Sequence, residues 1–235
     1  MPSSGSANVP ETFEVSVRTG NADLGGMLGV PDGARGIVLF AHGSGSSSRS
    51  PRNRRVARVL QDAGLATLLF DLLTPEEERI DAVTRELCFD IRLLAERMRG
   101  ATDWVTSHPP LDRLAIGHFG ASTGAAAALI AAADRPDVVH AVVSRGGRPD
   151  LAGEALERVR APTLAIVGGR DTEVIELNEE ALARMSCPRM LQIVQGATHL
   201  FEEPGTLERV AELAASWFRR YLVPKTEARV GPEVP

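Results

Sequence analysis

The chain has 235 residues, of which 43% are hydrophobic and 24% charged, as in an ordinary globular protein with a substantial core. Its 26 Lys and Arg against 31 Asp and Glu give a net charge of −5, so the sequence shows no concentrated basic excess and we expect no nucleic-acid partner. No apolar run approaches the roughly 20 residues that span a bilayer, and the N-terminus lacks the pattern of a secretory signal, so we expect no membrane association.

The lysines, cysteines and histidines of the chain argue against several classes of enzyme. The only lysine is Lys225, near the end of the chain, which argues against pyridoxal-phosphate enzymes, P-loop NTPases and kinases. The two cysteines, Cys88 and Cys187, do not make a disulfide framework, and the histidines show no metal-binding spacing. We therefore expect a cytoplasmic protein that uses no metal and no cofactor.

The elements alternate along the chain. A hairpin is predicted first, from strands at 12–18 and 22–30 joined at Gly20 and Asn21. Short apolar runs then predict strands at 36–43, 65–72, 113–120, 138–144, 163–169 and 189–196, the first two of them buried. Longer stretches between and after them predict helices at 50–64, 90–108, 122–134, 151–158, 174–185 and 206–222. This order predicts an α/β fold, with a mostly parallel central sheet and helices on both faces.

The domain organisation follows from the same pattern. Residues 11–223 are expected to form a single domain, between ends at 1–10 and 224–235 that we expect to be disordered. The stretch from 144 to 162 is too short to hold a large cap domain, so we expect an open site.

A charged segment at 73–90 follows the strand predicted at 65–72. Thr74 is expected to cap a short helix there. The segment could be a partial lid, with Leu72, Leu73 and Phe89 lining a pocket, but a charge run of this kind is more often a solvated helix face.

The sharpest motif is GHFGASTGA at 117–125, which places Ser122 in G-x-S-x-G between a predicted strand and a predicted helix. This is the setting of a nucleophile elbow, because Gly120 and Gly124 leave room for a strained turn that exposes the serine. The alternative is that Ser122 only caps an alanine-rich helix, but a cap does not need both glycines.

A serine nucleophile needs a base, and the base needs an acid that orients it. Asp171 and His199 each follow a later predicted strand, in the chain order that this kind of sheet requires. The alternatives are a helix cap for Asp171 and a structural hydrogen bond for His199. Asp71 could be the acid instead, although we favour a role in bracing its loop.

The loop FAHGSGSSS after the first buried strand is expected to supply part of an oxyanion hole. One N–H donor should belong to Thr123, and the other to Ser44 or, less favoured, Gly45, which is also a candidate for substrate binding. His42 is expected to brace this loop. The run GSGSSS also resembles the start of a dinucleotide fingerprint, but it lacks the third glycine.

Arg145 follows another predicted strand and therefore lies at the edge of the expected site. Its guanidinium could hold a substrate carboxylate in a bidentate pair, or it could pair with an acidic residue of the protein. The sequence leaves both readings open, as it does for the nearby Arg148.

Together the motifs HGSGSS, GHFGASTGA, SRGGRPD, GGRDTEVIELN and GATHLFEEPG resemble the α/β-hydrolase superfamily, and within it the dienelactone-hydrolase-like group, over about residues 12–222. The resemblance implies the α/β-hydrolase fold, Ser122 as nucleophile, Asp171 as acid, His199 as base and Ser44 in the oxyanion loop. Named dienelactone hydrolases carry a cysteine at the elbow, so the serine here favours an esterase.

We therefore expect a serine hydrolase, resembling a carboxylesterase, that cleaves a small-molecule ester or lactone through an acyl-enzyme on Ser122. A peptidase or thioesterase on the same three residues is the first alternative, and a ligand-binding protein without catalysis is the second. The chain is expected to act as a monomer or homodimer.

Overall fold

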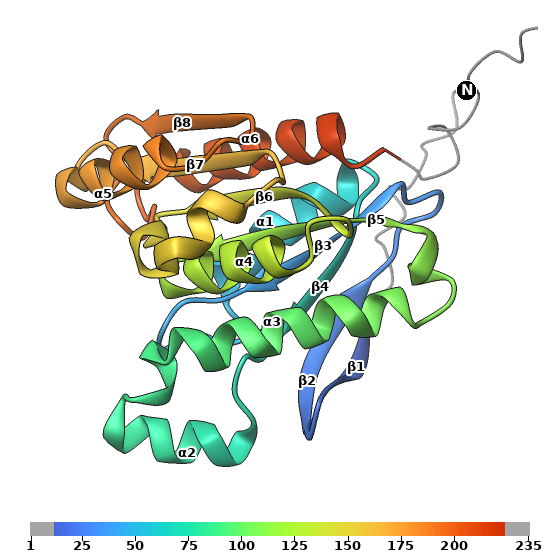
Figure 1. Cartoon of the computed structure of the whole chain (residues 1–235). Coiled ribbons are helices and arrows are strands. Elements are labelled where there is room, and N and C mark those ends of the chain that lie inside the picture. Colours follow the sequence, from blue (N-terminus) through green and yellow to red (C-terminus); the bar gives the residue numbers. More distant parts are fainter. Residues whose placement is uncertain (1–11, 224–235) are drawn as a thin grey trace, which may run out of the picture.

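The computed structural model describes residues 12–223, and both ends for which disorder is predicted lie outside this range. Within it, one sheet has the strand order β1-β2-β4-β3-β5-β6-β7-β8 (Figure 1). Its strands are β1 (Thr12–Thr19), β2 (Ala22–Gly29), β3 (Gly36–Ala41), β4 (Ala66–Phe70), β5 (Ala115–Ala121), β6 (Val139–Arg145), β7 (Thr163–Gly168) and β8 (Arg189–Val194). β2 pairs antiparallel with β1 and β4, and all other neighbours are parallel, which confirms the predicted α/β sheet.

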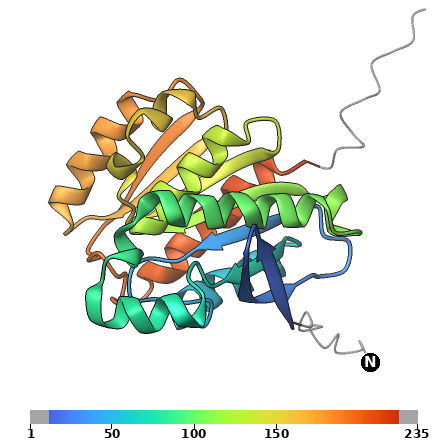
Figure 2. The same cartoon turned by 60° about the horizontal axis from the view of Figure 1, so that its bottom comes forward.

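Helices cover both faces of this sheet. The α-helices are α1 (Pro51–Asp62), α2 (Pro75–Thr84), α3 (Ile91–Thr106), α4 (Thr123–Asp134), α5 (Thr172–Ala183) and α6 (Thr206–Tyr221), and the 3-10 helices are η1 (Leu87–Phe89), η2 (Leu111–Arg113) and η3 (Pro149–Arg158). One apolar core joins the sheet to α1 and α6, and a second joins it to α3, α4, α5 and η3. Figure 2 shows α3 in front of the sheet, with α6 behind it. None of the helices within residues 12–223 is long and apolar enough to cross a membrane.

Two segments between strands show what the sequence pattern predicts well and what it misses. Thr74 caps α2 as predicted, because its hydroxyl accepts the Glu77 N–H while the Glu77 carboxylate accepts the Thr74 N–H. The α-helix expected at 151–158 is instead the 3-10 segment η3, in which Gly153 has a φ of +56° and interrupts the helical backbone. Between β6 and β7 the chain forms no other helix or strand, so this connection holds no cap domain.

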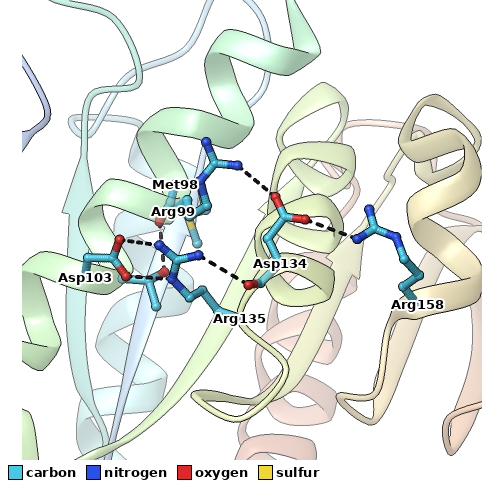
Figure 3. A network of polar contacts seen from close by, with 7 residues as sticks. Met98, Arg99, Asp103, Asp134, Arg135 and Arg158 are labelled. Carbon is cyan, nitrogen blue, oxygen red and sulfur yellow. Dashed lines mark hydrogen bonds and ion pairs between the residues drawn. The ribbon is translucent and has the colours of Figure 1, made fainter.

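A polar network ties α3, α4 and η3 together at the C-terminal end of α4 (Figure 3). Arg135 holds Asp103 through two hydrogen bonds of 2.8 and 2.6 Å. Asp134 lies between Arg99 at 2.8 Å and Arg158 at 3.4 Å. These partly exposed pairs each contribute at most about 1 kcal/mol, so their main effect is to fix one end of α4 while its other end carries Ser122.

His118 lies in β5 beneath α3 and α4 and is fully buried. Its Nδ1 donates to the carbonyl of Ala128 at 3.1 Å, and in the neutral ring Nε2 lies as an acceptor 3.0 Å from the Thr102 hydroxyl, whose proton it shares with the Met98 carbonyl. Burial lowers the pKa of His118 to about 4. The residue is thus a neutral packing group that joins two helices to the central strand.

This burial predicts a loss of stability in mild acid. The folded-state pKa of His118 lies below the unfolded value of about 6.5. In mild acid His118 is therefore protonated in the unfolded chain but not in the folded chain. The free energy of unfolding should therefore fall by about 2 kcal/mol through His118 alone as the pH drops from 7.5 to 5.

Urea unfolding of the wild type and of His118→Gln at the two pH values measures this contribution. The variant should be less stable at pH 7.5 but should lose about 2 kcal/mol less on acidification. A remaining slope is expected from His42, whose pKa burial also lowers. Equal acid losses in the two proteins would contradict the assignment.

Candidate active site

Ser122 occupies the sharp turn between β5 and α4. Its backbone has φ +51° and ψ −124°, a strained conformation for a residue with a side chain. The flanking glycines are required by close packing, since a Cβ on Gly120 would lie 2.4 Å from the Ala125 Cα and one on Gly124 would lie 2.3 Å from the Ala41 carbonyl oxygen. Ser122 stands at the N-cap position, but its hydroxyl makes no capping hydrogen bond. The turn therefore has the geometry of a nucleophile elbow, and capping does not explain the serine.

Asp171 and His199 form a hydrogen-bonded pair across 28 positions of sequence. The Asp171 carboxylate accepts from His199 Nδ1 at 2.7 Å. Asp171 is the N-cap residue of α5, yet its side chain makes no cap bond, so its carboxylate is committed to the histidine. This bond leaves Nε2 of the neutral imidazole as the free acceptor.

The end of β6 brings these residues together with the elbow. The Ser122 N–H donates to the Arg145 carbonyl at 3.4 Å, and a Cβ on the next residue, Gly146, would lie 3.6 Å from His199 Cε1. The elbow and the Asp–His pair therefore adjoin the same two residues at the carboxyl edge of the sheet. Among residues 12–223, no hydrogen bond joins Ser122 to His199. Hydrogen bonds between a nucleophile and its base are often long without substrate and shorten when substrate binds.

The loop after β3 passes directly beside the elbow. A Cβ on Gly43 would lie 2.9 Å from that of Ser122, so this glycine permits the close approach. The Ser44 N–H donates to the Thr123 hydroxyl at 3.2 Å, which places the two predicted oxyanion donors side by side. Thr123 is the first residue of α4, where backbone N–H groups have no partner within the helix. The Ser44 N–H, by contrast, already has an acceptor that an oxyanion would have to displace or share.

His42 and Asp71 brace this loop, as expected. The His42 Nε2 accepts the Leu72 N–H at 3.0 Å, and its Nδ1 donates to the Gly43 carbonyl at 3.0 Å. The Asp71 carboxylate accepts the Ser48 N–H at 2.7 Å. Burial lowers the pKa of His42, so this histidine is a neutral bridge between β3 and the end of β4.

A cavity of about 310 Å³ opens beside the oxyanion loop. Its apolar wall comes from the end of β4, η1 and the start of α3, and its rim from the loop 42–47 and α2. The lining residues are His42, Gly43, Ser44, Gly45, Ser46, Ser47, Leu72, Leu73, Glu78, Asp81, Ala82, Arg85, Cys88 and Leu94. Gly45 thus lies on the cavity wall, whereas Phe89 does not line the cavity and is 51% exposed, so its expected place in the pocket is wrong. No residue of α2 is buried, and the helix contributes Glu78, Asp81 and Ala82 to the cavity lining.

The two arginines after β6 differ in their surroundings. Arg148 holds Asp150 through two hydrogen bonds of 2.9 and 2.7 Å. Arg145 is only 8% exposed, and its Nε and Nη1 atoms are buried without a hydrogen-bond partner. Burial, together with the nearby charge of Arg52, lowers the pKa of Arg145 to about 10. No carboxylate within residues 12–223 forms an ion pair with it, so the expected alternative of an internal partner is not met.

Two supporting residues escape prediction from sequence. Gly43 is one, because only the folded loop shows how closely it approaches Ser122. The other is Glu203, whose carboxylate accepts the Thr198 N–H at 3.1 Å and so holds the loop that carries His199. This hydrogen bond keeps the pKa of Glu203 below its usual value. Its only sequence signal is an acidic pair shortly after the histidine. Within residues 12–223, no three His, Cys, Asp or Glu side chains gather in a group that could hold a metal ion.

The mostly parallel sheet, the elbow and the Asp–His pair at its carboxyl edge define an α/β-hydrolase fold. Residues 24–222 match the Dienelactone hydrolase family, and the chain belongs to that family. This confirms the resemblance found in the sequence motifs and shows that the chain is a hydrolase of the α/β-hydrolase type.

Individual relatives agree with the family. The crystal structure of a dienelactone hydrolase from Anabaena variabilis is 62% identical, with a TM-score of 0.90 over 91% of this chain and 99% of that one. Est1E from Butyrivibrio proteoclasticus shares the fold at 16% identity, with a TM-score of 0.73 over 88% of this chain and 98% of its own. A Mycobacterium tuberculosis protein named "Putative phosphoribosyl transferase" is 60% identical over 89% of this chain. The chain spans only 46% of that relative's length.

Proposed function

We propose that this protein is a serine hydrolase that cleaves a small carboxylic ester or lactone through an acyl-enzyme on Ser122. The observation that carries the proposal is the 2.7 Å hydrogen bond between Asp171 and His199 at the sheet edge where Ser122 is held at φ +51°. The acid orients the histidine, and the serine stands in a strained turn with a hydroxyl that makes no capping bond. This arrangement makes an alcohol nucleophilic.

In the first half of the reaction His199 Nε2 takes the proton of Ser122 Oγ as that oxygen attacks the ester carbonyl. The Asp171 carboxylate holds the imidazole in the tautomer that can accept this proton, and it stabilises the imidazolium that forms. The carbonyl oxygen becomes an oxyanion that accepts hydrogen bonds from the Thr123 and Ser44 backbone N–H groups, each typically worth about 3 kcal/mol. His199 then gives its proton to the departing alcohol, and the acyl-enzyme remains.

In the second half a water molecule replaces the alcohol. His199 takes a proton from this water, which attacks the acyl carbon, and the resulting oxyanion occupies the same two N–H donors. Collapse of the intermediate breaks the bond to Ser122 Oγ, which recovers its proton from His199. For each water consumed, an ester yields one acid and one alcohol, and a lactone yields a single hydroxy acid.

The cavity beside the oxyanion loop supports a small substrate. Its volume of about 310 Å³ is at the lower end of the range for small-molecule sites, and its wall includes the apolar side chains of Leu72, Leu73 and Leu94. The absence of a cap between β6 and β7 keeps this edge of the sheet open.

A hydrolysis panel tests the proposed reaction class. We expect saturable turnover of 4-nitrophenyl acetate or butyrate and of small lactones, with much slower cleavage of the matched amides and thioesters. Faster cleavage of amides or thioesters would move the activity to a peptidase or thioesterase. Failure to turn over any acyl substrate would favour a binding protein without catalysis.

A further inference from the structure

The guanidinium of Arg145 is a buried cation that the proposed reaction does not use. Charged side chains are rarely buried unless an opposite charge pairs with them, because removing a charge from water costs several kcal/mol. Arg145 is 8% exposed, and its Nε and Nη1 atoms have no hydrogen-bond partner. A bound anion would stabilise an unpaired buried cation of this kind.

The acidic residues around this edge of the sheet are already engaged. Glu202 pairs with Arg52 at 3.5 Å, and the other carboxylates hold backbone or imidazole N–H groups. Those carboxylates and their partners are Asp71 with Ser48, Asp171 with His199, and Glu203 with Thr198. Within residues 12–223, no carboxylate forms an ion pair with Arg145.

A second cation shares the same neighbourhood. Arg52, in the first turn of α1, lines a cavity together with Phe201, and a Cβ on Gly146, the residue after Arg145, would lie 3.4 Å from the Phe201 ring. The Nε of Arg52 is also buried without a partner, and its charge contributes to the lowered pKa of Arg145. Both side chains belong to the α1 and α6 side of the sheet, since Arg145 follows Val143 by two positions in β6 and Val143 packs in the core on that side. Arg145 has two nitrogens without a partner, and Arg52 has one, its Nε, while its Nη1 pairs with Glu202. Together these unused N–H donors match a doubly charged oxyanion better than a single carboxylate.

We infer that Arg145 and Arg52 form a binding site for a phosphate group, either as free phosphate or as part of the substrate. The Arg145 carbonyl accepts the Ser122 N–H, so the backbone of Arg145 adjoins that of the proposed nucleophile. A phosphate carried by a substrate would therefore fix the position of an ester near Ser122. The role in positioning an ester rests on the proposed function, whereas the phosphate-binding site does not.

Thermal unfolding with inorganic phosphate, against sodium chloride at equal ionic strength, tests the site directly. With 10 mM phosphate and a Kd of about 1 mM, we expect the wild-type Tm to rise by about 3–5 °C. Arg145→Met should abolish this rise while keeping or raising the Tm without phosphate, because it removes an unpaired buried charge. The matched control is Arg55→Met, whose arginine lies on the same helix as Arg52 and pairs with Glu208. This variant should keep the phosphate response.

Two results would overturn the inference. One is a wild-type Tm that phosphate does not raise. The other is an Arg145→Met protein that is less stable without phosphate and still responds to it fully. A lower Tm together with an intact phosphate response in this variant would show instead that the guanidinium is a structural group.

A pair of esters separates free from substrate-borne phosphate. We expect 4-nitrophenyl 4-phosphonobutanoate to exceed 4-nitrophenyl butyrate in kcat/KM by about tenfold or more, with the preference lost in Arg145→Met and kept in Arg55→Met. A phosphate-dependent Tm without this preference would support a site for free phosphate. If neither ester reacts but phosphate still acts through Arg145, the proposed hydrolase function fails while the phosphate site stands.

Discussion

Replacing Ser122 by alanine is expected to abolish ester hydrolysis, with a fall in kcat of at least about 10⁴-fold, and to leave the fold intact. The acyl-enzyme cannot form without the Oγ atom, and the loss of a nucleophile in an Asp–His–Ser system reaches about 10⁶-fold. Stability should change by less than about 0.5 kcal/mol, because the Ser122 hydroxyl makes no capping bond to α4. Steady-state assays with 4-nitrophenyl butyrate and urea unfolding measure the two quantities.

A serine far from the site provides the control. Ser107, at the C-terminal end of α3, is exposed and bonds only to neighbouring groups of its own turn. Ser107→Ala should therefore retain full activity. If Ser122→Ala kept more than a few per cent of wild-type turnover, the nucleophile would lie elsewhere.

Replacing Asp171 by asparagine is expected to lower kcat by about 10⁴-fold. The asparagine amide can donate to His199 Nδ1, which favours the tautomer with its proton on Nε2, the atom that must accept the Ser122 proton. KM should change little, because Asp171 contacts the histidine and does not line the cavity. The side chain makes no cap bond to α5, so thermal stability should stay close to that of the wild type.

Asp71→Asn is the matched comparison. This aspartate lies at the end of a neighbouring strand, and its carboxylate holds the Ser48 N–H at 2.7 Å. Losing the charge there weakens a loop brace, and we expect a fall in kcat of about tenfold or less. The opposite order of effects, with Asp71→Asn inactive and Asp171→Asn active, would show that Asp71 is the acid.

Much of the fold could be predicted from the sequence because its signals are local. The hairpin at the N-terminus, the apolar runs that form the strands and the cap at Thr74 depend on residues within a few positions of one another. The break in η3 depends on Gly153 at positive φ, which the helical pattern of its neighbours conceals. The outward position of Phe89 depends on how α2 and η1 meet the body of the protein, which no periodicity records.

The candidate site also contains residues that the sequence predicts and residues that only the folded chain reveals. Ser122 carries its own local motif, and Asp171 and His199 follow from chain order because parallel strands end at a common edge. The approach of Gly43 to Ser122, the Ser44 contact with Thr123 and the Glu203 brace join segments that meet only in the folded chain. The isolation of Arg145 is likewise invisible in sequence, since it depends on every nearby carboxylate having another partner.

The most direct test of the central claim is covalent labelling with a fluorophosphonate probe, followed by intact-protein mass measurement and peptide mapping. Such a probe reacts with an activated serine and forms a stable adduct on its Oγ atom. We predict one adduct per chain, located on Ser122, and none on Ser122→Ala or on denatured protein. An unlabelled wild type, or an adduct that maps to another residue, would contradict the account.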